Sequence, residues 1–422
     1  MFSTNFKEGL FDLSIARNPS EVLIGWSKLD NEEAEKSVVV ALDDYKKSAY
    51  FPGVLDLVRS NDSHLIPYFK SENLYFMDSE LLNDMMLSGN QPFEFKLDYS
   101  IMLDTNYASY IDNFIKGNWN SIPNEALLTI DVLLKNDFRY DYWFYMIENY
   151  KNSFGSEESK GITNKKIKFY ENLVNLELFK NIDTMKYKLT RQIEYMMTKD
   201  EALISADQIF NGVFNSNNGK EMMNTFIPIH KNMVLLLLGI FQIKFADKSN
   251  ISTKLQKLFE YSHKVIGVYF ERELMIAHKY FCKAENVKIL AGINKGMKTD
   301  NLLKIIENIA WDFTVPRIME FFLTRIGEGR FFIPFFLSND YKLRELLKLF
   351  AVKGIVYNKR EGFFLPISDE NIYDYYTRYD VDVKQYFTFE AIEERKGVYQ
   401  SNCENEFIIV KEEYQKLLNI LG

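Results

Sequence analysis

The chain has 422 residues, of which 47% are hydrophobic and 26% charged, so its composition is globular and its length allows more than one domain. A formal net charge of −8 argues against broad, charge-driven binding to nucleic acid, although a metal ion can still hold a phosphate group. The two cysteines, Cys282 and Cys403, are too few for a disulfide framework. Met1 to Leu10 lack a signal-peptide pattern, so we expect a cytoplasmic protein. The most apolar run, Met233 to Ile243, falls short of the roughly 20 residues that span a bilayer, which predicts a buried helix and no membrane association.

The first part of the chain, residues 1–95, carries mixed signals and is predicted to be an α/β region. Leu74 to Met77 reads as a short strand, and the following Asp-Ser-Glu favours the start of a helix. Val38 to Leu42 is compatible with a helix face or with a short strand. We leave open whether this region is a separate domain.

The next part begins with a strand and continues as helices. Ile101 to Asp104 reads as a strand, and Ala108 to Ile115 as a helix that ends near Gly117. A new helix is expected near Pro123, because proline is favoured in the first helical turn. From there to about residue 290 the apolar residues recur at helical spacing, so we expect 118–260 to be all helical.

After the helices, the pattern returns to alternating strands and helices. A helix is predicted from about Asn301 through Asp312, followed by a strand at Phe331–Leu337 that is expected to be short on one side of Pro334. An amphipathic helix from Tyr341, a glycine and the strand Ile355–Tyr357 follow, an order typical of α/β folds. Residues 359–422 are predicted to form an α+β C-terminal region, with Phe407 to Val410 as a strand.

Two aspartates follow the two most apolar predicted strands. In an open α/β sheet, ligands bind beyond the carboxyl ends of the strands, which is where Asp104 and Asp340 are expected. We hypothesise that Asp312 joins them from its helix. Several carboxylates at one place repel one another, and a divalent cation such as Mg²⁺ or Mn²⁺ relieves that repulsion. Such ions cleave phosphodiester bonds by activating water, so the pattern favours a metal-dependent nuclease.

The motifs around these aspartates resemble those of PIN-like ribonuclease domains. Leu103-Asp104-Thr105-Asn106 is similar to the opening motif of that family, and Ile309-Ala310-Trp311-Asp312 to its mid-domain helical aspartate. The segment from Phe336 to Asp340, followed by a helix and Gly354-Ile355-Val356, resembles its closing motif. The resemblance implies a central parallel sheet flanked by helices. It also implies that the helical segment 118–260 is an insertion, which splits the core into 96–117 and 261–358.

The family also uses an acid, usually glutamate, near the start of a helix between the first and third aspartates. Glu273 is our choice, because it stands in a Glu-Leu pair at the start of a predicted helix. Glu271, Glu125 and Asp112 remain alternatives. The resemblance therefore implies that Asp104, Glu273, Asp312 and Asp340 act as catalytic metal ligands for Mg²⁺ or Mn²⁺.

Other polar residues near the motifs are candidates for substrate binding: Thr105, Asn106, Ser338 and Arg317. Each acid also has a simpler explanation. Asp104 and Asp340 suit helix N-caps, Asp312 suits a salt bridge to Arg317, and Glu273 suits a solvated helix charge.

The leading hypothesis is an endoribonuclease that hydrolyses RNA with a metal-activated water. Analogy suggests a toxin or phage-defence effector, with the helical insertion binding a protein partner or antitoxin. The rival is a non-enzymatic, helical protein-interaction module whose acids are caps. A third hypothesis is another phosphate-directed hydrolase that uses the same acids. The sequence does not specify the oligomeric state.

Overall fold

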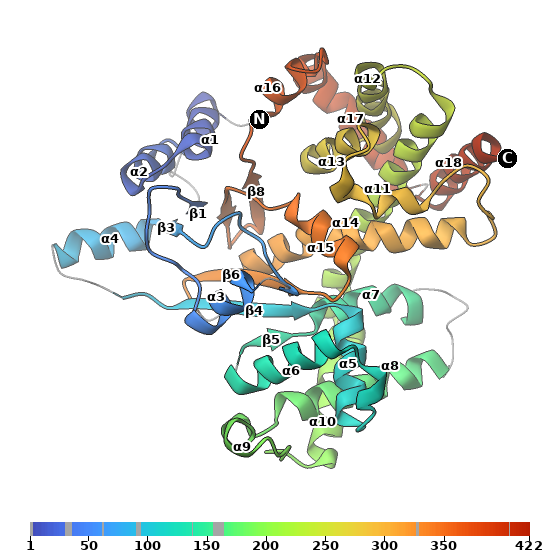
Figure 1. Cartoon of the computed structure of the whole chain (residues 1–422). Helices are drawn as coiled ribbons and strands as arrows, with labels where there is room; N and C mark the ends of the chain where they lie inside the picture. Colours follow the sequence, from blue (N-terminus) through green and yellow to red (C-terminus); the bar gives the residue numbers. More distant parts are fainter. Residues whose placement is uncertain are drawn as a thin grey trace.

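Two four-stranded sheets and a larger set of helices make up the chain (Figure 1). The computed structural model describes residues 3–29, 36–60, 63–89, 94–136, 138–154, 164–325, 329–404 and 406–422. The strands are β1 (Ser37–Ala41), β2 (Leu65–Pro67), β3 (Leu74–Met77), β4 (Leu97–Leu103), β5 (Tyr140–Asp141), β6 (Phe331–Leu337), β7 (Gly354–Asn358) and β8 (Phe363–Ile367). The expected α/β class is confirmed at this level, since the chain is rich in helices and carries small sheets.

The first sheet has the order β2-β6-β4-β5 and contains the strands that lead to the candidate site. Strand β4 runs parallel to β6 over seven residue pairs, from Leu97 opposite Phe331 to Leu103 opposite Leu337. All seven residues of β6 are buried, which explains its continuous apolar sequence. Strand β2 is antiparallel to β6 and pairs only with Phe335 to Leu337, so the pairing between these two strands does not include Pro334. Strand β6 itself continues through Pro334, so the expectation of a strand that is short on one side of this proline is wrong. Proline is tolerated here because β2 does not pair with it.

The second sheet has the order β3-β1-β7-β8, and all its pairings are antiparallel. Val38 to Ala41 therefore form a strand, which settles the choice between helix and strand. The resemblance implies a central parallel sheet, but strand β7 does not continue the sheet of β4 and β6. It pairs instead with β1, where Gly354 comes so close that an added Cβ would lie 2.6 Å from the carbonyl oxygen of Val39.

The helices that precede α11 lie beside the N-terminal strands and in the lower part of Figure 1. They are α1 (Thr4–Ile15), α2 (Pro19–Ser27), α3 (Pro52–Arg59), α4 (Ser79–Ser88), α5 (Thr105–Ile115), α6 (Asn124–Asn136), α7 (Trp143–Phe154), α8 (Asn164–Lys180), α9 (Thr184–Thr190) and α10 (Lys199–Phe210). Helix α5 ends near Gly117 as predicted, and the positive φ of 75° at that residue favours glycine.

The remaining helices form the upper and right-hand part of Figure 1. They are α11 (Asn217–Ala246), α12 (Ile251–Tyr261), α13 (Glu271–Phe281), α14 (Leu302–Arg325), α15 (Tyr341–Lys348), α16 (Ile372–Thr377), α17 (Phe389–Glu404) and α18 (Glu406–Leu421), with short π segments at Asn211–Asn215 and Ser262–Ile266. Helix α11 is long and apolar enough to cross a membrane, but 67% of its most apolar window is buried, as expected of a core helix.

Two predictions of secondary structure are wrong. The segment 118–260 is not all helical, because β5 lies in it and pairs in parallel with Ile101 and Met102 of β4. Strand β5 has only two residues, which are too few to show the alternation of apolar and polar side chains that predicts a strand. The segment Phe407–Val410 is part of helix α18, since a short apolar run does not distinguish a strand from a buried helix.

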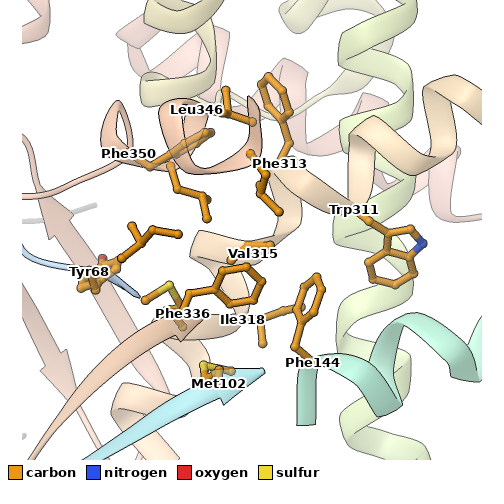
Figure 2. Packing of buried hydrophobic residues seen from close by; sticks show 14 of the residues in the cluster. Tyr68, Met102, Phe144, Trp311, Phe313, Val315, Ile318, Phe336, Leu346 and Phe350 are labelled. Carbon is orange, nitrogen blue, oxygen red and sulfur yellow. The ribbon is translucent and has the colours of Figure 1, made fainter. Parts of the chain in front are cut away.

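The core beside the candidate site lies between the first sheet and helices α7, α14 and α15 (Figure 2). Phe336 of β6 meets Phe144 of α7 edge to face, with ring centroids 5.0 Å apart. Phe313 of α14 meets Phe350, just beyond α15, in the same way at 5.7 Å. Buried aromatic residues thus hold three helices against the sheet end at which β4 and β6 finish.

Candidate acidic site

The parallel pairing of β4 and β6 brings two polar segments together where both strands end. Leu103 and Leu337 are the last paired residues, so Asp104 and Ser338 follow at the same edge of the sheet. The backbone N–H of Asp104 donates to the carbonyl oxygen of Leu337 at 3.1 Å. The expectation that Asp104 and Asp340 share the carboxyl edge is therefore confirmed by the strand register.

Asp104 is only 3% exposed and is the N-cap of α5. Its Oδ1 accepts a hydrogen bond from the backbone N–H of Tyr107 at 2.6 Å. Burial raises the pKa of Asp104 to about 7; hydrogen bonds from Ser338 and Tyr107 act against that rise, and the charges of Glu148 and Asp340 add to it. Asp104 is thus a helix cap, as the simpler explanation has it, and it also faces two other carboxylates.

Asp340 is the N-cap of α15 and is exposed to solvent. Its Oδ1 accepts from the backbone N–H groups of Lys342 at 2.8 Å and Leu343 at 3.2 Å. The backbone N–H of Asp340 donates to the hydroxyl of Ser338 at 3.1 Å. Ser338 therefore touches both strand-end aspartates and fixes their relative position.

Asp312 comes from α14, more than 200 residues after β4. Burial raises its pKa well above the ordinary value, and the charges of Glu148, Asp340 and Asp104 raise it further. The neighbouring side chains of Trp311 and Phe313 are buried and anchor this turn of the helix (Figure 2). Pro316, four residues later, has no N–H to donate to the Asp312 carbonyl, so the helix is weakened at this turn.

Glu148 of α7 is the fourth acid, which the sequence analysis missed. It accepts a hydrogen bond from the hydroxyl of Thr105, the residue after Asp104. Burial raises the pKa of Glu148, and the bond from Thr105 lowers it. We call Asp104, Glu148, Asp312 and Asp340 the acidic cluster. Glu148 was overlooked because it lies in the segment interpreted as an insertion. What distinguishes it is its position in α7, the helix that directly follows strand β5 of the first sheet.

Glu273, the predicted second acid, belongs to a different group of charges. Its carboxylate is fully buried and accepts from Nη2 of Arg317 at 2.6 and 2.7 Å. Arg317 also donates from Nη1 to Glu320 at 3.1 Å, and Arg272 binds the same glutamate. The structure therefore corrects two expectations: Glu273 pairs with a buried arginine, and Arg317 is held by carboxylates in the core. The expected salt bridge between Arg317 and Asp312 is not formed, because the guanidinium of Arg317 binds Glu273 and Glu320.

The alternative second acids also lie in other surroundings. Asp112 of α5 accepts from Lys116 at 2.8 Å and from Asn175 at 2.6 Å. Glu125 is exposed in the first turn of α6. Burial raises the pKa of Glu271, whose charged neighbours are Arg272, Arg317 and Glu273.

The predicted substrate-binding residues near the cluster have two kinds of surroundings: some form hydrogen bonds to the acids, and one is exposed to solvent. Thr105 and Ser338 hold members of the acidic cluster, as described above. Asn106 is exposed in the first turn of α5 beside the cluster. Two of the four candidates thus position acids, and Asn106 is open to solvent at the same edge.

The acidic cluster is not a closed metal cage. Within the described part of the chain, no three histidine, cysteine, aspartate or glutamate side chains lie close enough to hold a metal ion. The raised pKa values of Asp104 and Asp312 express first the cost of ionising a buried carboxyl and second the negative charges of Glu148 and Asp340 nearby.

Comparisons with known proteins add no relative. No family model, curated protein or solved structure matches the chain. The function is therefore argued from the acidic cluster.

Proposed function

We propose that the protein is a metal-dependent endoribonuclease of PIN-like type, with the acidic cluster as its active site. The observation that supports this is that the charges of Glu148 and Asp340 act on both Asp104 and Asp312, although the four acids come from four separate elements. Their location beyond the carboxyl ends of parallel strands is where α/β sheets bind ligands. Buried acids whose pKa values are raised by one another are typical of functional sites.

The chemistry of these donors suits Mg²⁺ or Mn²⁺, since both ions prefer carboxylate oxygens. Asp104, Glu148, Asp312 and Asp340 would hold the ion, and the protons that burial and repulsion favour at Asp104 and Asp312 would leave on binding. Because no three of these groups are within reach of one ion as they stand, binding requires side-chain rotation. A bound ion would supply Lewis acidity to the scissile phosphate.

The chain's own residues orient the acids. The Thr105 hydroxyl holds Glu148, and Ser338 holds Asp104 through its side chain. Helices α5 and α15 begin at the cluster, and their N-terminal N–H groups favour negative charge. A phosphodiester would therefore meet positive helix ends beside the acids.

The test replaces Asp104 and Asp340 separately with Asn and measures RNA cleavage with Mn²⁺. Asparagine caps helices about as well as aspartate, so both variants should fold while losing activity. Asp183→Asn is the matched control, because Asp183 caps α9 through an equivalent bond to the Lys186 N–H at 2.8 Å. Full activity in both site variants would end the proposal.

The non-enzymatic interaction module remains the second candidate, and the lack of a formed metal cage among the described residues favours it. Thermal stability with and without Mn²⁺ separates the two. An ion that binds the folded chain at about 100 times its dissociation constant adds about 2.7 kcal/mol to the free energy of unfolding. Helix caps alone predict no such gain.

A further inference from the structure

A cysteine and a histidine lie side by side at the end of helix α13. Sγ of Cys282 is 3.3 Å from Nε2 of His278, one helical turn earlier. The thiol is exposed to solvent, whereas the histidine is only 3% exposed. Helix α13 lies in the upper part of Figure 1, and α5, which begins at the acidic cluster, lies in the lower part. A nucleophile within hydrogen-bond reach of a base is the arrangement that activates a thiol for reaction.

Two tyrosines of α16 hold the histidine in place. Nδ1 of His278 lies 2.6 Å from the hydroxyl oxygen of Tyr375, and the ring of Tyr379 meets the imidazole with centroids 4.1 Å apart. If Nδ1 donates its proton to that hydroxyl oxygen, Nε2 carries no proton and faces the thiol. Burial and the charge of Lys279 lower the pKa of His278, so the imidazole is neutral at pH 7 and able to accept a proton.

The charges that act on this thiol are positive. Burial raises the pKa of Cys282, and the charges of Lys244 and Lys279 oppose that rise. Burial lowers the pKa of Lys244, and two further lysines lower it more. We call these four cations the lysine patch: Lys244, Lys254, Lys279 and Lys283. Within the described part of the chain, none of them forms a salt bridge with a carboxylate. In a chain with a net charge of −8, such a patch attracts anions to the thiol.

We propose that Cys282 is a nucleophilic thiol that reacts with small anionic disulfides, with His278 as the base that takes its proton. Sγ attacks one sulfur of the disulfide, the S–S bond breaks, and a mixed disulfide forms at Cys282. The thiol proton moves to Nε2 of His278 and then to the departing thiolate, so the disulfide is itself the oxidant and one of its halves leaves as a thiol. Reactive cysteines are typically found in partly exposed, electropositive surroundings of this kind. The site is independent of the proposed nuclease function.

The chain contains its own comparison thiol, because its other cysteine, Cys403, is exposed on α17. The full-length Cys403→Ser and Cys282→Ser chains each keep one thiol. Their reaction at neutral pH with the dianionic disulfide dithiobis-nitrobenzoate is followed by the absorbance of the released thiolate. Cys282 should react at least roughly tenfold faster than Cys403, since a positioned base accelerates proton transfer. An equal or slower reaction at Cys282 overturns the proposal.

Two variants of the Cys403→Ser chain separate the base from the lysine patch. His278→Gln should slow the reaction roughly tenfold, both with the anionic disulfide and with dicationic cystamine, because it removes the proton acceptor. Lys244→Gln should slow the anionic disulfide alone, by roughly 2- to 5-fold, the effect of one screened charge. Lys220→Gln is the matched control, since Lys220 is exposed at the opposite end of the same helix, α11.

An unchanged rate in His278→Gln overturns the role of the base, and equal slowing of both disulfides in Lys244→Gln overturns the role of the patch. Because His278 is buried, its variant counts only if its melting temperature lies within about 2 °C of the parent. The comparison of the two single-thiol chains decides the proposal without that variant.

Discussion

Replacing Asp104 with Asn should make the protein more stable above neutral pH. The pKa of this carboxyl is raised from 3.8 to about 7 in the folded chain, mainly by burial. The folded state therefore binds more protons than the unfolded state between these values, and the wild-type free energy of unfolding falls as the pH rises through this window. The pKa values of the folded and unfolded states differ by roughly 3, and a difference of one corresponds to about 1.36 kcal/mol. The gain in the free energy of unfolding of the variant is therefore at most about 4 kcal/mol.

The structure also indicates that the substitution removes little else. Asparagine keeps an oxygen that accepts from the Tyr107 N–H, and its amide N–H can donate to the hydroxyl oxygen of Ser338. The substitution also removes one of the charges that raise the pKa of Asp312. Urea unfolding at pH 5 and pH 8, without divalent metal, measures the effect. We expect a gain of at most about 1.6 kcal/mol at pH 5, since pH 5 lies about 1.2 above the unfolded pKa of 3.8, and of at most about 4 kcal/mol at pH 8.

The Asp183→Asn control changes a cap outside the cluster and keeps Asp104, so its stability should fall between pH 5 and pH 8 as that of the wild type does. If Asp104→Asn were equally or less stable than the wild type at pH 8, the electrostatic strain at the cluster would be absent and the reasoning refuted.

Two further predictions concern the other charges. Glu148→Gln should lower Mn²⁺-dependent RNA cleavage by at least about tenfold while the fold persists, because only a charge beside Asp104 is lost; unchanged cleavage rates would exclude Glu148 from the site. Arg317→Met leaves the buried carboxylates of Glu273 and Glu320 without their shared cation, and should reduce the free energy of unfolding by about 3–5 kcal/mol in urea titrations. A loss below about 1 kcal/mol would contradict the assignment of that arginine to the core.

Much of the local structure around the site was predictable. The apolar runs before Asp104 and Asp340 do end as strands, and both aspartates cap the helices that follow. These features depend on residues within about four positions of one another, where propensity and capping rules operate. The meeting of Asp104, Asp312 and Asp340 was a hypothesis from motif order. The strand register and the effect of the Asp104 and Asp340 charges on Asp312 agree with it.

The sequence by itself determined where strands end, which polar residues begin the next helices, and that α11 would be buried. Only the tertiary structure decided which acids meet: Glu148 joins the cluster through Thr105, whereas Glu273 is taken by Arg317. It also decided that β5 extends the first sheet and that β7 belongs to the second. The physical reason is that a carboxylate's partner is set by packing between segments far apart along the chain, and a residue's immediate neighbours carry no record of that partner.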